Sequence, residues 1–379
     1  MNFTPNIVAV RLHVTPRLRT KGLRRGGKFR TLTAGLSPKK THSSAEILST
    51  HTAALFQGAV ARAAELLRAG EVVALPTETV YGLAANALAA RAVERIYEIK
   101  GRPAHNPIIV HVAGLEMARQ CVADWPATAE ELARAFWPGP LTMVLRRSMA
   151  IPDIVTAGGD TVGVRWPSHP FIQAVIRACG FPLAAPSANP SNQISPTNSA
   201  HVAKNLGEKV PLIIDGGQAQ VGIESTVIDL TANPPRVLRP GMIHAESLAA
   251  VLGALGGETA GTANEGALRS PGQLPRHYSP KARLKMSLWR DSADLHAQIA
   301  GQKLRMDKVH IIAHTVIPSD EGLGRVSVIP HDAEAFARAL YAELHACDEG
   351  GAEWIIVEAL PDGPEWRAVA DRLKRAAMV

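Results

Sequence analysis

Polar side chains that can bind an anion recur in short segments between residues 77 and 241 of the 379-residue chain. Six groups stand out: Thr77-Glu78-Thr79 with Tyr81 and Gly82; Lys100-Gly101-Arg102 with Asn106 and, further on, His111; Thr161 to Arg165; Ser187-Ala188-Asn189 with Ser195 and Thr197; Glu224-Ser225-Thr226; and Arg239 to Gly241. Guanidinium forks, an ammonium group and hydroxyl donors match the oxygens of a phosphate. We therefore expect one site for a phosphate-bearing anion. Phosphoryl or nucleotidyl transfer suits such a site, because it depends on positioning and charge stabilisation.

Each group taken alone also has a simpler interpretation. A loop threonine is more often a helix N-cap or a turn residue. Lys100-Gly101-Arg102 could be a solvated helix end whose positive charges are favoured by the helix macrodipole. His111 could be a core histidine with its hydrogen bonds satisfied, and Ser187 to Asn189 could be a plain turn. The concentration of all six groups between residues 77 and 241 is what favours a common site.

Several common sites are absent from the sequence. It contains no GxxxxGK[ST], GxGxxG, HExxH or GxSxG motif, and its 14 histidines lack metal-ligand spacing. The three cysteines (Cys121, Cys179, Cys347) form no CxxC pair, which excludes a disulfide scaffold and a cysteine-rich zinc site. No apolar run approaches the ~18 residues of a membrane span. We expect a cytoplasmic protein with no membrane association and no metal ligands of its own.

The net charge of +7 is concentrated at the N-terminus. Residues 1–45 hold ten Lys and Arg and no acidic residue, which leaves 31 basic and 34 acidic residues in the rest of the chain. Three interpretations of this basic segment stay open: a solvated disordered tail, an overlong translation start, and a targeting or nucleic-acid-binding arm. It lacks the apolar stretch of a secretory signal.

The six polar groups fall between elements whose periodicity indicates an α/β protein. Phe56, Val60, Ala64 and Leu67 recur at helical spacing before Gly70, and residues 71–75 then predict a buried strand followed by a loop over 77–82. Further strands are expected at 108–112, 141–145, 161–166, 182–185, 211–215, 225–230 and 236–239, and further helices at 93–100, 132–136, 171–179, 197–206 and 245–255. The irregular alternation predicts that some strands are antiparallel.

A second, smaller α/β domain follows a linker. Residues 256–280 are rich in Gly, Pro, Ala and Ser, as linkers are. Beyond them, strands are expected at 284–288, 309–313, 326–329 and 354–358, and helices at 333–347 and 366–377. We expect four parts: an N-terminal extension (1–48), a first domain (49–250), a linker (251–283) and a C-terminal domain (284–379).

Eight ordered motifs carry a resemblance to a known family. They are LPTETVYGLAANA (75–87), IKGRPAHNPIIVHV (99–112), FWPGPLT (136–142), TVGVRWPSHP (161–170), APSANPSNQISPT (185–197), DGG (215–217), GIESTVIDL (222–230) and VLRPG (237–241), with SPGQLPRHYSPKA (270–282) in the linker. The chain resembles the YrdC-like family, and within it the two-domain L-threonylcarbamoyladenylate synthases. The resemblance implies a twisted mixed sheet around a large concave cavity, plus a Rossmann-like C-terminal domain.

The resemblance also implies a reaction. The family converts L-threonine, bicarbonate and ATP, with Mg²⁺ and no tightly bound cofactor, into threonylcarbamoyl-AMP and pyrophosphate. A downstream tRNA threonylcarbamoyl-transfer complex uses the product to make N6-threonylcarbamoyladenosine.

The matching positions assign the site residues by resemblance. Threonine binding is implied for Thr79, His111, Arg165, the backbone at Ala185, and Ser225; ATP binding is implied for Arg102, Asn106, Thr161, Ser187, Ser195, Arg239 and Tyr278. Lys100 and Arg102 are expected to be the catalytic cations that stabilise the developing charge, with Lys100 facing phosphate or bicarbonate. No general base for the threonine amine is identified. The sequence departs from the family pattern at Ala84, where glycine is common, and at Pro275 before the retained Arg276-His277-Tyr278.

Two other functions stay open. An RNA-binding protein would suit a concave basic surface and the N-terminal arm, but the rest of the chain is near neutral, which disfavours binding through phosphate neutralisation. A carbamoyltransferase module of the same fold would be accompanied by acylphosphatase and zinc-finger segments, which the sequence does not show.

Overall fold

The computed structural model describes residues 44–257, 268–272 and 277–377. Most of the N-terminal extension, and Pro275 and Arg276 of the linker, lie outside the described residues. Within them, ten strands form one mixed sheet in the order β1-β8-β2-β3-β7-β4-β6-β5-β9-β10. The strands are β1 (Glu46–Ser49), β2 (Val73–Leu75), β3 (Gly82–Asn86), β4 (Val110–His111), β5 (Leu141–Arg146), β6 (Thr161–Arg165), β7 (Leu183–Ala184), β8 (Leu212–Asp215), β9 (Thr226–Asp229) and β10 (Arg236–Arg239).

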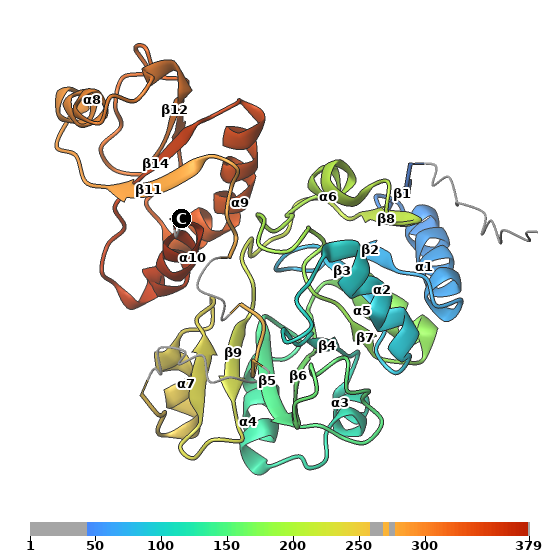
Figure 1. The fold of residues 1–379 in the computed structure, drawn as a ribbon. Coiled ribbons are helices and arrows are strands. Elements are labelled where there is room, and N and C mark those ends of the chain that lie inside the picture. The colour runs from blue at the N-terminus through green and yellow to red at the C-terminus, as the bar shows by residue number, and fades with distance from the viewer. Residues whose placement is uncertain (1–43, 258–267, 273–276, 378–379) are drawn as a thin grey trace, which may run out of the picture. The chain divides into compact units, whose positions relative to one another are not determined.

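Parallel and antiparallel pairs alternate irregularly across this sheet. The β1·β8, β2·β8, β4·β6 and β5·β9 pairs are parallel, and the β2·β3, β3·β7, β4·β7, β5·β6 and β9·β10 pairs are antiparallel. The mixed α/β class expected from the sequence is therefore confirmed (Figure 1).

Helices connect these strands and cover the sheet. They are α1 (Ala53–Arg68), α2 (Ala90–Lys100), α3 (Leu115–Cys121), α4 (Ala127–Phe136), α5 (Pro170–Cys179), α6 (Ser199–Leu206) and α7 (Ala245–Leu252). Local chemistry explains where several begin and end. The Thr52 hydroxyl accepts from the Leu55 amide at the start of α1, and α5 has proline at its first position. Gly101 ends α2 in the left-handed conformation (φ 58°), which glycine adopts without strain.

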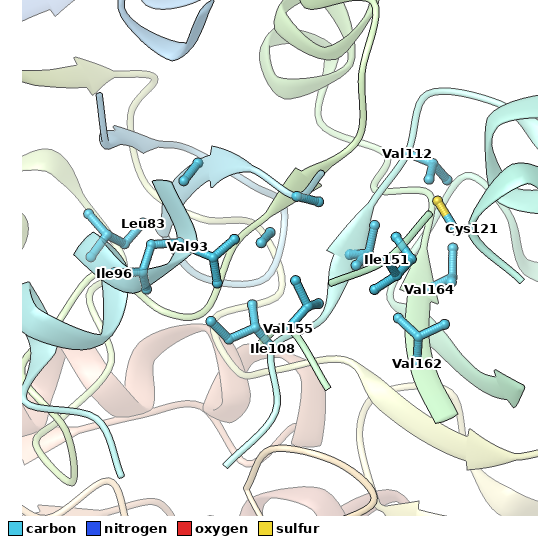
Figure 2. Packing of buried hydrophobic residues seen from close by; sticks show 14 of the residues in the cluster. Leu83, Val93, Ile96, Ile108, Val112, Cys121, Ile151, Val155, Val162 and Val164 are labelled. Carbon is cyan, nitrogen blue, oxygen red and sulfur yellow. The ribbon is translucent and has the colours of Figure 1, made fainter. Parts of the chain in front are cut away.

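The core lies between the sheet and these helices. Figure 2 shows Leu83 of β3 near Val93 and Ile96 of α2, with Ile108 and Val164 in the same buried cluster. On α2, Val93 and Ile96 lie three residues apart on one face, as an amphipathic helix requires. Burial of this face fixes α2 against the sheet, so that the polar residues at its C-terminal end have a defined position.

The C-terminal domain is a separate parallel sheet with helices. Its strands β11 (Arg283–Ser287), β12 (Val309–Ala313), β13 (Arg325–Val328) and β14 (Trp354–Glu358) have the order β11-β14-β12-β13. Its helices are α8 (Ser292–Gly301), α9 (Ala333–Glu349) and α10 (Arg367–Ala377), with short 3₁₀ helices at Met306–Lys308 and Pro364–Trp366. All three strand pairs are parallel, as expected for a Rossmann-like domain. None of the described helices is long and apolar enough to span a membrane.

Among its strands and α-helices, the structure differs from the sequence-based elements in four places. Strand β1 falls in the segment that we assigned to the extension and pairs with β8, so the sheet of the first domain starts at Glu46, ahead of the expected residue 49. Strand β3 begins at Gly82, where we expected only a loop, and α3 and α8 were not expected at all. Four residues of β1 and seven of α3 are too few to show a periodicity.

Candidate active site

A polar pocket lies at the ends of strands from the middle of the large sheet. The space within it, part of which is open to solvent, is about 550 Å³, and its lining includes Pro271, Gly272, His277 and Tyr278 of the linker. Nine of the residues implied by the resemblance line it: Thr79, Arg102, His111, Arg165, Ala185, Ser187, Ser225, Arg239 and Tyr278. These residues come from separate segments, so the fold, and not proximity in sequence, assembles the site.

The strand register explains part of this assembly. His111 and Arg165 are paired directly at the ends of the parallel strands β4 and β6. Strand β7 runs antiparallel to β4, and the chain leaves it at Ala185 to enter the pocket. Side chains of neighbouring strands in register share one face of a sheet. His111 and Arg165 therefore reach the same cavity.

Arg165 is buried, with 4% of its surface exposed, and three groups hold its guanidinium in place. Its Nη1 donates to the Thr79 hydroxyl at 3.0 Å, and its Nε donates to the Gly139 carbonyl at 3.3 Å. Its Nη2 lies 2.7 Å from Glu78 Oε1, in an ion pair that is not aligned as a hydrogen bond. Burial by itself would raise the pKa of Glu78, but the charge of Arg165, together with its close polar contact and the hydrogen bond from the Ser168 amide, holds that pKa below its usual value. Arg165 is thus a preorganised cation.

His111 is a neutral imidazole at the same end of the pocket. Burial first, and then the charge of Arg165, lower its pKa to about 3. Among the described residues its Nδ1 has no hydrogen-bond partner. A buried polar atom without a partner is costly in an empty site and is satisfied when a ligand binds. His111 can therefore exchange a hydrogen bond with a ligand without adding charge.

Arg239 connects strand β10 to the start of β9. Its Nε and Nη2 donate to the Ser225 carbonyl at 3.0 and 2.9 Å, and its Nη2 also donates to the Ser225 hydroxyl at 3.1 Å. A Cβ at Gly241 would lie 2.4 Å from the Thr226 amide nitrogen, so the close approach of the two segments requires glycine there. The Nη1 of Arg239 donates to the Pro271 carbonyl at 3.3 Å, which ties the linker to the pocket wall.

Lys100 is the last residue of α2 and Arg102 comes two residues later, but their side chains contact different groups. Arg102 lines the pocket, and its Nη2 donates to Asn106 Oδ1 at 2.7 Å. Burial lowers its pKa to about 10, so it is charged at neutral pH. Lys100 does not line the pocket. Its Nζ donates to the Ser187 carbonyl at 2.5 Å and to the Asn189 carbonyl, because the N–H groups of a buried amine need acceptors. We expected Lys100 to face phosphate or bicarbonate; the structure instead places it behind the loop that contains Ser187 and Asn189.

Three other implied residues stand outside the pocket lining. Asn106 supports Arg102 through its side-chain oxygen. Ser195 is fully buried and donates to Glu224 Oε1 at 2.6 Å, so it touches the pocket wall from behind. Thr161 is the first residue of β6, at the opposite end from Arg165, and pairs with Arg146. The structure therefore does not bring Thr161 to the other implied residues.

Residues of the C-terminal domain also reach this region, and sequence reasoning missed them. Glu224 lines the pocket and accepts from Arg372 Nε at 2.8 Å and from the Tyr341 hydroxyl at 3.0 Å. Burial favours a raised pKa for Glu224, but the charges of Arg372 and then Arg239 bring it to about 2. The sequence analysis included Glu224 in one of the six polar groups but missed Arg372, 148 positions away. The available signal was that Arg372 falls on the apolar face of its helix, with Val369, Leu373 and Ala376.

The donor set does not form a metal cage. In the described part of the chain, no group of three or more His, Cys, Asp or Glu side chains could hold a metal ion. Glu224 is the carboxylate that lines the pocket, and both its oxygens already accept hydrogen bonds. The guanidinium groups and hydroxyls of the lining can donate hydrogen bonds to the oxygens of an anion.

Comparisons with known proteins cover both domains. A family model described as "Telomere recombination" matches residues 65–241, and a model described as "Threonylcarbamoyl-AMP synthase, C-terminal domain" matches residues 243–378. A threonylcarbamoyl-AMP synthase from Pyrococcus abyssi is 41% identical over 324 residues, which is 83% of this chain and 93% of the relative. One from Bacillus subtilis is 39% identical, over 84% of this chain and 92% of the relative.

A solved structure agrees with these sequence matches. The crystal structure of Pyrococcus abyssi Sua5 complexed with L-threonine superimposes with a TM-score of 0.79 at 39% identity. The match covers 87% of this chain and 96% of that one. The second family model begins at residue 243, so it includes the linker residues that line the pocket.

Proposed function

The chain belongs to the threonylcarbamoyl-AMP synthase family, and on that basis we propose that it makes threonylcarbamoyl-AMP from L-threonine, bicarbonate and ATP, with release of pyrophosphate. One observation carries the proposal: nine residues that the family motifs assign to the two substrates converge on a single pocket. The alternatives, an RNA-binding protein and a carbamoyltransferase module, find no specific support in the pocket or in the relatives matched.

Threonine binds at the end of the pocket formed by β4 and β6. The fixed guanidinium of Arg165 pairs with the carboxylate, because a preorganised arginine binds carboxylate oxygens with little loss of entropy. The Thr79 and Ser225 hydroxyls and the neutral His111 bind the polar groups of the substrate. Since His111 carries no charge, it does not repel the substrate ammonium.

ATP binds at the end of the pocket formed by Arg102, Ser187, Arg239 and Tyr278. The buried guanidinium of Arg239 and the partly buried guanidinium of Arg102 supply positive charge for the phosphates, which enter as the Mg²⁺ complex of ATP. Lys100 positions Ser187 by holding the carbonyls of its loop. Asn106 likewise holds Arg102 in place. Their role is support for the groups that touch the nucleotide.

The reaction then needs two bonds to form. The unprotonated threonine amine attacks the carbon of bicarbonate, the C–OH bond of bicarbonate breaks, and its oxygen leaves as water with a proton from the amine, which gives a carbamate. A carbamate oxygen then attacks the α-phosphate, and the bond from that phosphorus to pyrophosphate breaks. Arg102 and Arg239 stabilise the negative charge that builds up on the phosphate oxygens. The product is a labile mixed anhydride, so a downstream tRNA threonylcarbamoyl-transfer complex must accept it soon after release.

Pyrophosphate release tests the proposal directly. With ATP and Mg²⁺, release should require both L-threonine and bicarbonate, and a threonylcarbamoyl-AMP peak should appear in chromatography. Arg239→Met should abolish most of this activity. Arg236→Met, on the same strand but outside the pocket lining, should retain it and is the matched control. Release that is independent of threonine or bicarbonate would disprove the proposed function.

A further inference from the structure

Helices α9 and α10 of the C-terminal domain place two side chains on the carboxylate that lines the pocket. Arg372 of α10 is completely buried, and its Nε lies 2.8 Å from Glu224 Oε2. The Tyr341 hydroxyl of α9 donates to the same oxygen at 3.0 Å. The guanidinium also donates from Nη2 to the Glu224 carbonyl at 3.3 Å. Both the side chain and the backbone of Glu224 are therefore held from the C-terminal domain.

The charge of Glu224 is a problem for a site that binds polyphosphate. The residue lines the pocket beside Ser225 and Arg239, and its other oxygen, Oε1, accepts from Ser195. An uncompensated carboxylate in this wall would repel phosphate groups over a short, weakly screened distance. Arg372 provides the compensating charge from outside the pocket, since it is absent from the lining itself.

The same arginine also contacts the linker. Its guanidinium carbon lies 5.3 Å from the ring centroid of Tyr278, which is within cation–π distance. The Tyr341 ring packs on Tyr278 as well, with centroids 5.8 Å apart. Tyr278 has a φ of 60°, a left-handed conformation that a non-glycine residue adopts only when its surroundings hold it there. Its hydroxyl lacks a partner among the described residues and lines the pocket.

We propose that Arg372 is a positioning residue for the nucleotide half of the pocket, because it neutralises Glu224 and holds Tyr278 in place from the C-terminal domain. The inference rests on the proposed function for its kinetic test. It gives the C-terminal domain a defined task in nucleotide binding. ATP carries several negative charges whereas threonine is a zwitterion with no net charge, so the loss of Arg372 should act mainly on ATP.

The experiment compares two arginines of α10 in the full chain. Arg372→Met keeps the length of the side chain but removes its charge. Arg367→Met is the control: Arg367 also pairs with a residue of the first domain, Glu246, but that pair is about half exposed on both sides. For Arg372→Met we expect the KM for ATP to rise about tenfold or more, while the KM for threonine stays within about twofold. Arg367→Met should resemble the wild type.

Two further variants keep the test valid if Arg372→Met folds poorly, as judged by circular dichroism and melting. Tyr341→Phe removes one hydrogen bond to Glu224 and should raise the KM for ATP by about two- to tenfold. Glu224→Gln combined with Arg372→Met removes both charges and should recover much of the ATP affinity lost in Arg372→Met. Failure of this double variant to recover would overturn the charge argument.

Other outcomes decide separately on the inference and on the proposed function. Equal kinetics for Arg372→Met and Arg367→Met, or equal rises in both KM values, would overturn the role of Arg372. A wild-type protein without threonine-dependent pyrophosphate release would overturn the proposed function instead. Calorimetric binding of ATP to the same variants needs no turnover, so it tests Arg372 in either case.

Discussion

Arg165→Met should separate threonine binding from nucleotide binding. Arg165 is the buried cation at the end of β6, held by Thr79, Gly139 and Glu78. Methionine preserves most of the volume but offers the threonine carboxylate no donor. Hydrogen bonds to charged groups contribute about 1.5–3 kcal/mol each, so losing a bidentate pair costs about 3 kcal/mol or more.

That loss corresponds to a rise of roughly 100-fold in the KM for threonine. The KM for ATP should change by less than about threefold, because Arg102 and Arg239 are untouched. Initial rates of pyrophosphate release, measured at saturating ATP with varied threonine and then the reverse, give both constants. A threonine KM within about threefold of the wild type would refute the assignment of Arg165, as would equal rises in both constants.

The same substitution has a cost in stability. Without Arg165, the buried Glu78 carboxylate loses its ion-pair partner, and breaking a buried pair typically costs about 3–5 kcal/mol. The double variant Glu78→Gln with Arg165→Met should recover much of this loss without recovering threonine affinity. Arg95→Met is the matched control, since Arg95 pairs with Glu71 in a more exposed position and should cost at most about 1 kcal/mol. Urea unfolding monitored by tryptophan fluorescence measures all three.

Three other predictions follow from the same geometry. Lys100→Met should raise the KM for ATP more than the KM for threonine, because the Ser187 and Asn189 carbonyls lose their common donor. Steady-state kinetics measure both constants, with Lys100→Arg, which keeps N–H donors, as the comparison. A larger rise in the KM for threonine would contradict this prediction. Valine should replace threonine poorly, by about 100-fold or more in kcat/KM, because it leaves buried polar groups of the pocket unpaired; comparable turnover of both amino acids would argue against Thr79, His111 and Ser225 as walls. The pKa of His111 is about 3 in the folded chain, below the ordinary value near 6.5, so the unfolded chain binds more protons between these two values and the free energy of unfolding should fall as the pH drops below about 6.5. His111→Gln should reduce the loss of this free energy between pH 7 and pH 5, as measured by urea titrations. An unchanged loss would show that other groups account for it.

Some of this site could be predicted from the sequence because its residues lie at the ends of recognisable strands. Arg165 ends a strand whose alternation buries Val162 and Val164 on the other face, so its position could be anticipated. Lys100 shows the limit of this reasoning. Its neighbours in sequence indicated a phosphate contact, but its actual partners are carbonyls 87 and 89 residues away. Tertiary packing determines which acceptors a buried amine contacts, and the local sequence does not specify that packing.

Arg372 could not have been predicted for a related reason. It is the sixth of the eleven residues of its helix and falls on the same face as the buried Val369 and Leu373, but an arginine at such a position usually extends its charged end to solvent. Only the packing of α10 brings it to Glu224. Thr161 shows the opposite case, in which a motif implied a role but the register of β6 places the residue away from the pocket.

Strand β1 has a consequence for how the chain behaves outside its native state. It pairs along the whole of β8, and the amide of its flanking residue Ala45 donates a hydrogen bond to the Gly207 carbonyl. A proteolytic cut near residue 50 would remove this short strand and expose one side of the apolar β8, with free amide and carbonyl groups. Such an edge is a template for strands of other molecules. The four residues Glu46–Ser49 therefore act as a cover against intermolecular β-pairing, and trimming the N-terminus beyond residue 45 should increase aggregation well before it affects catalysis.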